Sequence, residues 1–214
     1  SEVSTKYIYK WDNNKKIPIN FDSIRGKFIA VLDYGIKNNI LKILNQSKYQ
    51  IIVFPYNFKM EKILNKNTVG LFLSNGPGDP KATFEKIKNN LSLIKNIQIP
   101  IFGICLGHQI LSLLFGGKTE KMHHGHRGAN HPIKNHANGK VEITVQNHGF
   151  VVSKKKLPAN MKITHSSLFD GSIAGIKIIK KPFFSVQYHP ESSPGPQDSR
   201  YLFQKFEKLI ENYA

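Results

Sequence analysis

Short apolar runs alternate with helix-like patterns through the first half of this chain. The apolar runs lie at residues 27–32, 50–54, 70–74 and 99–104. They have the length and the flanking turn residues of buried strands. Between them, apolar residues recur at the spacing of one helix face at residues 36–44, and similar patterns cover residues 58–64 and 83–95. Strands and helices that alternate in this way predict a mostly parallel sheet covered by helices.

The second half changes to short β segments. These lie at residues 141–146, 161–165, 174–179 and 183–188. A final helix is expected over residues 199–211, where five apolar residues share one face. Residues 1–22, which include Trp11, show neither pattern and predict an irregular leading arm. The fold class we expect is therefore α/β, with a central, mostly parallel sheet flanked by helices and a smaller β-rich second half.

Composition narrows the class of protein. The 214 residues, 40% of them hydrophobic, can form one good core and one domain or at most two. No apolar run approaches the ~20 residues of a membrane span, and no signal-peptide pattern is present, so we expect no membrane partner and a cytoplasmic location. The single cysteine excludes an internal disulfide, which fits a reducing compartment.

The net charge of +17 is a possible sign of a nucleic-acid partner. The lysines, however, are scattered along the chain, and only residues 154–156 form a block. No basic stripe interleaved with aromatic residues is present. Lys, Asn and Ile are abundant together, which resembles the codon bias of an AT-rich genome such as a plastid. We therefore expect no nucleic-acid partner, and the plastid stroma is the alternative location.

The only cysteine, Cys105, lies between Gly103 and Gly107 where a short strand leads into a helix. A sharp turn there lifts a side chain clear of the sheet, as in the nucleophile elbow of serine hydrolases. The glycines remove side chains that would crowd the turn, and the following helix N-terminus favours a thiolate. Cys105 is therefore a candidate nucleophile. The alternative is a buried structural cysteine, the commoner role of a lone thiol.

His189 and Glu191 lie at the end of the last predicted strand. Residues two apart on a strand point to the same face, so the two side chains can reach one site. A thiol nucleophile needs a base, and the base needs an orienting acceptor. Together with Cys105 they supply these three roles. An isolated histidine near a carboxylate is more often a surface or core residue, so the argument depends on the Cys105 turn.

The two motifs, Gly-x-Cys-x-Gly-x-Gln and a downstream His-Pro-Glu, closely resemble those of the class I glutamine amidotransferases. More narrowly, the chain is similar to the glutaminase domain of the carbamoyl-phosphate synthetase small subunit. The stretches that carry the narrower resemblance are residues 32–41, 74–80, 125–128, 130–132, 146–150, 165–171 and 193–196. That subunit has a further N-terminal domain. We therefore expect residues 1–26 to be a leading arm from a missing domain and residues 27–214 to form the amidotransferase domain, and Ser1 in place of Met fits a fragment or a cleaved product.

The resemblance implies hydrolysis of L-glutamine through a Cys105 thioester, with ammonia passed to a large synthetase subunit for arginine and pyrimidine synthesis. It implies an oxyanion held by N–H groups of Leu106 and of Gly76 or Gly78. The residues it assigns to the α-amino and α-carboxylate groups of glutamine are Gln109, Asn147, Gly149 and Phe150. Taken alone, the loop at residues 74–80 would be a turn. No cofactor is expected on this chain, which lacks a phosphate-binding loop motif; ATP, bicarbonate and Mg are expected on the partner.

Two other functions stay open. The chain could be the glutaminase component of a chorismate-using synthase, or a catalytically silent regulatory module of the same fold. Four histidines, His123, His124, His126 and His131, crowd one predicted loop and raise the question of a metal site. Regular spacing with a cysteine or carboxylate ligand is not evident there, so we predict no metal.

Overall fold

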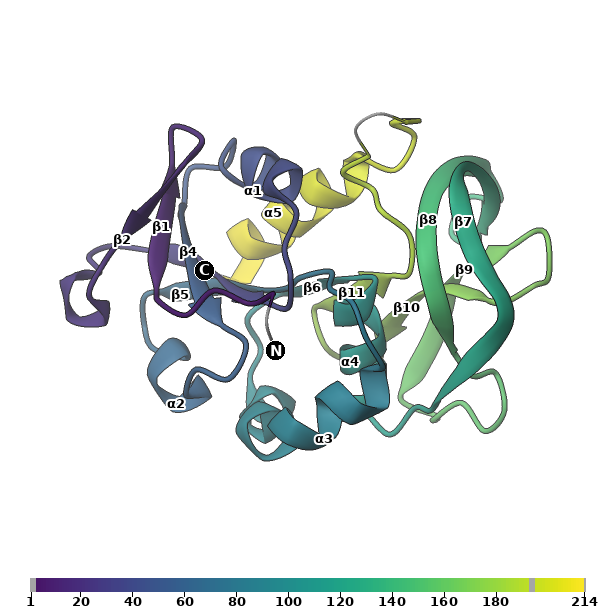
Figure 1. Ribbon diagram of the computed structural model, residues 1–214, viewed down its shortest axis with the longest axis horizontal. Helices are drawn as coiled ribbons and strands as arrows, with labels where there is room; N and C mark the ends of the chain where they lie inside the picture. The colour runs from purple at the N-terminus through teal and green to yellow at the C-terminus, as the bar shows by residue number, and fades with distance from the viewer. Residues whose placement is uncertain (1–2, 193–194, 214) are drawn as a thin grey trace.

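The computed structural model describes residues 3–192 and 195–213, so Ser193 and Pro194 of the 193–196 motif lie outside the described residues. The described strands form one eleven-stranded sheet in the order β2-β1-β4-β3-β5-β6-β11-β10-β9-β7-β8 (Figure 1). Its centre is parallel, as the alternating pattern predicts. The parallel strands are β3 (Phe28–Asp33), β4 (Gln50–Pro55), β5 (Thr68–Leu73), β6 (Ile101–Ile104) and β11 (Phe183–Val186).

Helices cover both faces of this parallel centre (Figure 1). On one face lie α1 (Asn38–Leu44) and α5 (Tyr201–Tyr213). On the other lie α2 (Met60–Ile63), α3 (Pro80–Leu91) and α4 (Leu106–Leu114). Successive residues of β3 alternate between the two cores: Ile29 packs with α1 and α5, and Ala30 with α2 to α4. Burial on both faces explains why the central strands are continuous apolar runs.

Helix α3 begins three residues earlier than the apolar pattern predicts. Asp79 caps it by accepting a hydrogen bond from the Lys81 N–H at 2.8 Å, and Pro80 occupies its first turn. Proline suits that position because the N–H it lacks would have no helical partner. The last residues of the predicted helix form a separate 3₁₀ turn, Ser92–Asn96. Another 3₁₀ turn, Phe21–Ser23, precedes β3.

The irregular arm predicted over residues 1–22 is wrong. Residues Tyr9–Asp12 (β1) and Lys15–Pro18 (β2) form a hairpin, and β1 pairs antiparallel with β4. The turn residues Asn13 and Asn14 both have positive φ, 47° and 61°, the conformation of a tight two-residue hairpin. Tyr9 and Trp11 lie on the face that packs into the core, so this segment extends the main sheet.

The predicted loop that holds the four histidines is also wrong, because those residues lie on a long strand, β7 (Thr119–Asn135). It pairs antiparallel with β8 (Val141–Val152), and the hairpin stands at one end of the molecule (Figure 1). The pairing shifts register twice, near Gly125 and Gly128, whose φ angles of 69° and 137° suit glycine. Strands β9 (Met161–Ser167) and β10 (Ile173–Ile178) join this hairpin to β11. Among the described helices, none has the length and apolarity to cross a membrane.

Candidate active site

Cys105 occupies the turn between β6 and α4 with φ 53° and ψ −102°, a backbone conformation that is rare for a residue with a side chain. The flanking glycines are required by close packing. A Cβ on Gly107 would lie 2.1 Å from the Leu73 carbonyl oxygen, and one on Gly103 would lie 2.8 Å from the Gly107 oxygen. The Gly107 N–H also donates to the Ser74 carbonyl at 3.0 Å, which fastens the turn to the end of β5.

His189 and Glu191 follow β11, which lies parallel to β6 and so brings them next to the Cys105 turn. The His189 Nδ1 atom lies 2.8 Å from Glu191 Oε1, and both side chains are buried. Burial disfavours a charged imidazole, but the hydrogen bond to the Glu191 carboxylate, the attraction of its charge and the proximity of the Cys105 sulfur outweigh burial and raise the pKa of His189 to about 9. For Glu191, burial is likewise outweighed, by His189 and Lys37, and its pKa is lowered. At neutral pH the pair is therefore imidazolium and carboxylate.

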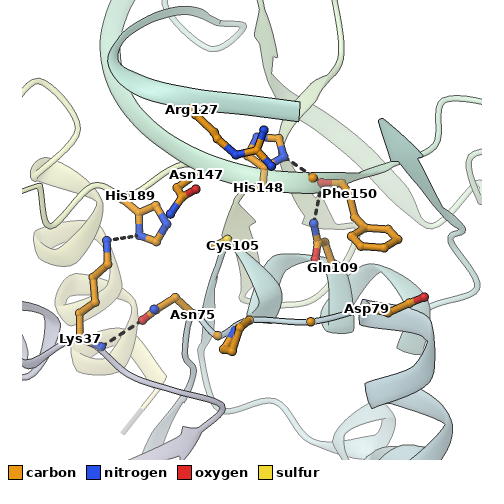
Figure 2. A pocket seen from close by; sticks show the side chains of 14 residues that line it. Lys37, Asn75, Asp79, Cys105, Gln109, Arg127, Asn147, His148, Phe150 and His189 are labelled. Carbon is orange, nitrogen blue, oxygen red and sulfur yellow. Dashed lines mark hydrogen bonds between the residues drawn. The ribbon is translucent and has the colours of Figure 1, made fainter. Parts of the chain in front are cut away.

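Lys37, which directly precedes α1, and Asn39, in the first turn of α1, both contact Glu191. The Lys37 Nζ atom lies 3.4 Å from both Glu191 Oε1 and His189 Nδ1 (Figure 2). The Asn39 side-chain amide donates to the Glu191 backbone carbonyl. Both residues belong to the stretch 32–41 that carries the narrower resemblance, but the sequence assigned neither a role in the site, because they are about 150 positions from the His-Pro-Glu motif.

A cavity of about 540 Å³ opens above Cys105 (Figure 2). Most of the predicted site residues line it: Gly76, Gly78, Cys105, Gln109, Asn147, Gly149, Phe150 and His189. Leu106 and Glu191 stand back from the wall. The Leu106 side chain is buried in the core beneath α4, and Glu191 lies behind His189. The remaining wall comes from residues that the sequence patterns did not assign to binding: Lys37, Asn75, Pro77, Asp79, Arg127 and His148.

The glycine loop after β5 forms the cavity wall opposite β8. The Asn75 side chain accepts from the Lys37 N–H at 3.2 Å and donates to the Gly35 carbonyl at 3.1 Å, so it fixes the loop against the segment after β3. A Cβ on Gly76 would lie 2.2 Å from the Tyr34 carbonyl oxygen, whereas Gly78, at φ 101°, faces open space. Glycine is thus needed at the first position for packing and at the second for backbone conformation.

Buried amides connect the cavity wall to the nucleophile. The Gln109 Nε2 atom donates to the Phe150 carbonyl at 2.8 Å and to Gln187 Oε1 at 3.0 Å. Gln187 in turn donates to the Cys105 sulfur at 3.7 Å. Gln187 lies two residues before His189, but nothing in the strand pattern distinguished it from other inward-facing residues.

Two other histidines near the site, His108 and His148, are held neutral by burial. Burial, with smaller contributions from His148 and His165, lowers the pKa of His108 to about 3, and its Nδ1 atom lies 2.9 Å from Ser185 Oγ. Burial also lowers the pKa of His148 to about 4. His126 contacts Gln146 and Asp170 on neighbouring segments. Within residues 3–192 and 195–213, no three His, Cys, Asp or Glu side chains are grouped to hold a metal ion.

Residues 30–209 match the family model described as "Glutamine amidotransferase class-I". The chain therefore belongs to the class I glutamine amidotransferase family, whose motifs the Cys105 turn and the His189–Glu191 pair carry. It is 50% identical over 217 residues to the carbamoyl phosphate synthase small chain of Bartonella henselae, and the aligned region covers 99% of this chain and 54% of that protein. It is 53% identical over 182 residues to the small chain of Brucella ovis, covering 85% of this chain and 45% of that protein.

The chain thus spans about half the length of the curated relatives it matches. A solved structure from Thermoplasma acidophilum, described as a "putative gmp synthase subunit a protein", superposes with a TM-score of 0.76 at 21% identity. The match covers 89% of this chain and 96% of that one. At that identity the similarity supports the α/β fold and not a shared substrate.

Proposed function

We propose that this chain hydrolyses L-glutamine to glutamate and ammonia through a thioester on Cys105. One observation carries the proposal: a histidine with its pKa raised to about 9, hydrogen-bonded to a buried carboxylate, lines the same cavity as the sole cysteine, and that cavity is large enough for glutamine. This arrangement supplies a thiol nucleophile and a proton carrier in one place.

In the first half-reaction, the Cys105 thiolate attacks the side-chain carboxamide carbon, and a carbon–sulfur bond forms. The carbon–nitrogen bond then breaks as His189 gives its proton to the departing ammonia. Neutral His189 next takes a proton from water, whose oxygen attacks the thioester carbon; the carbon–sulfur bond then breaks, which releases glutamate and regenerates the Cys105 thiolate. Glu191 stays ionised throughout and keeps the imidazole oriented.

Backbone N–H groups of Leu106 and of Gly76 or Gly78 stabilise the oxyanion in both steps. Leu106 N–H is at the start of α4, where helix N–H groups lack helical partners. The α-amino and α-carboxylate groups of glutamine contact Gln109 and the Asn147, Gly149 and Phe150 segment, all of which line the cavity.

We propose that a carbamoyl-phosphate synthetase large subunit receives the ammonia, with ATP, bicarbonate and Mg bound there and no cofactor on this chain. The support is the 50–53% identity to proteins named carbamoyl phosphate synthase small chain. The reaction would take place in a reducing compartment, the cytoplasm or the plastid stroma, because the mechanism requires a free thiol.

The test measures glutamate release in three mixtures: the chain alone, the longer small subunit, and that longer protein with its large subunit, ATP and bicarbonate. We expect activity to rise across the three, and Cys105→Ser to abolish it in each. A glutamine-like diazo-ketone should label Cys105 once, and a folded Cys105→Ala control should stay unlabelled. Equal rates in the three mixtures would refute coupling to the partner, and retained turnover in Cys105→Ser would refute the thioester.

A further inference from the structure

Gln187 is a buried polar residue directly beside the candidate nucleophile. Its side chain is 1% exposed, and its backbone N–H donates to the Ala174 carbonyl at 2.9 Å, so the residue is held at the end of β11. Its side-chain nitrogen lies 3.7 Å from the Cys105 sulfur. A buried amide at this depth needs partners for both ends, because leaving either end unpaired costs free energy.

The direction of each hydrogen bond follows from one fixed acceptor. The Phe150 backbone carbonyl can only accept, so the Gln109 side chain must present its NH₂ group there. The same NH₂ group lies 3.0 Å from Gln187, which must therefore present its oxygen to Gln109. The Gln187 NH₂ group is then the end that faces sulfur.

This orientation has a chemical consequence. A donor aimed at sulfur stabilises a thiolate more than a thiol, because a hydrogen bond to a charged acceptor is the stronger one. It also limits rotation of the Cys105 side chain, which is already at a constrained turn. Gln109 and Phe150 connect this donor to the cavity wall where glutamine is proposed to bind.

We propose that Gln187 is a positioning residue for the nucleophile, holding the Cys105 thiolate in place by a hydrogen bond whose direction Gln109 and the Phe150 carbonyl set. The role in turnover rests on the proposed glutaminase function. The hydrogen bond to sulfur does not, so it can be tested by the reactivity of the thiol alone.

The test is the pH profile of Cys105 alkylation by iodoacetamide, a small reagent that does not require the glutamine site. In Gln187→Met, which has similar volume and no donor, we expect the profile midpoint to rise by about one pH unit, a roughly tenfold loss of thiolate below the midpoint. Gln187→Glu should raise it further, because a carboxylate would place negative charge against sulfur. Ser185→Ala is the matched control: it removes a buried hydrogen bond to His108 from β11, two residues before Gln187, and should leave the midpoint unchanged.

Turnover provides the second readout. We expect Gln187→Met to lower kcat about tenfold with a smaller change in KM, since it alters the nucleophile more than the binding wall. An unchanged alkylation midpoint in either folded Gln187 variant, with folding verified by circular dichroism, would overturn the proposal. So would an equal shift in Ser185→Ala, which would indicate general loosening of the core. A shifted midpoint in a protein without glutaminase activity would uphold the hydrogen bond and reject only the proposed function.

Discussion

The backbone strain at Cys105 predicts that glycine at this position stabilises the protein. With φ 53° and ψ −102°, Cys105 is in a region that side chains avoid and glycine does not. The comparison is between Cys105→Ala and Cys105→Gly. Both variants remove the thiol and its hydrogen bond from Gln187, so they differ only in a Cβ and in the strain that it causes.

Three contributions set the magnitude. Relief of a strained backbone is worth about 1–3 kcal/mol. Against it, glycine loses about 0.5–1 kcal/mol relative to alanine through the entropy of the unfolded chain. Loss of one buried methyl group costs up to about 0.8 kcal/mol, since Cys105 is 6% exposed. The balance favours glycine by about 1 kcal/mol, which corresponds to a Tm rise of about 2–4 °C for a chain of this size.

The assay is thermal unfolding by calorimetry, with chemical denaturation as a second measure. Ala82→Gly is the control, because Ala82 is exposed in the first turn of α3 and its backbone is helical. There glycine should destabilise the protein by about 0.5–1 kcal/mol. If Cys105→Gly is less stable than Cys105→Ala by as much as this control, the turn stores no strain and the reasoning fails.

Three further predictions concern the site and its surroundings. His189→Asn should lower glutamate release by about 10²–10⁴-fold and more than Glu191→Gln does, because only His189 carries protons in both half-reactions; equal losses in steady-state assays would contradict these roles. Burial lowers the pKa values of three histidines to about 3–4 from 6.5: His108, His148 and His165. Below pH 6.5 these three histidines bind more protons in the unfolded chain than in the folded one. Their contribution to the free energy of unfolding is therefore fully present above pH 6.5 and is lost as the pH falls toward 4, by up to about 4 kcal/mol per pH unit near pH 5. Equal urea midpoints at pH 7 and pH 5 would refute this. Gly107→Ala should lower the free energy of unfolding by about 3 kcal/mol or more, because the added Cβ would lie 2.1 Å from the Leu73 carbonyl oxygen. Gly149→Ala is the control: its Cβ would have no atom within 4 Å, so this variant should unfold at the wild-type Tm.

The parallel centre of the sheet could be predicted because each strand is buried on both faces. Burial of that kind requires continuous apolar runs, which are visible without any knowledge of neighbours. Strand β7 could not be found in the same way. It is mostly exposed, contains two register shifts and carries polar residues along most of its length. The β1–β2 hairpin did have a local signal: Tyr9 and Trp11 alternate along β1, and the Asn13-Asn14 turn follows them.

The sequence by itself determined those features of the site that depend on residues close together in the chain. Glycines at Gly103 and Gly107 mark a crowded turn. His189 and Glu191 do contact each other, as their spacing of two residues predicted, but they lie in a turn after β11 and not on the predicted strand. Only the tertiary structure decided which distant side chains complete the site. Lys37 reaches Glu191 across 154 positions, and Gln187 reaches the thiol because β11 lies beside β6. Such contacts depend on strand order and register, which arise from the packing of the whole sheet and leave no local pattern in the chain.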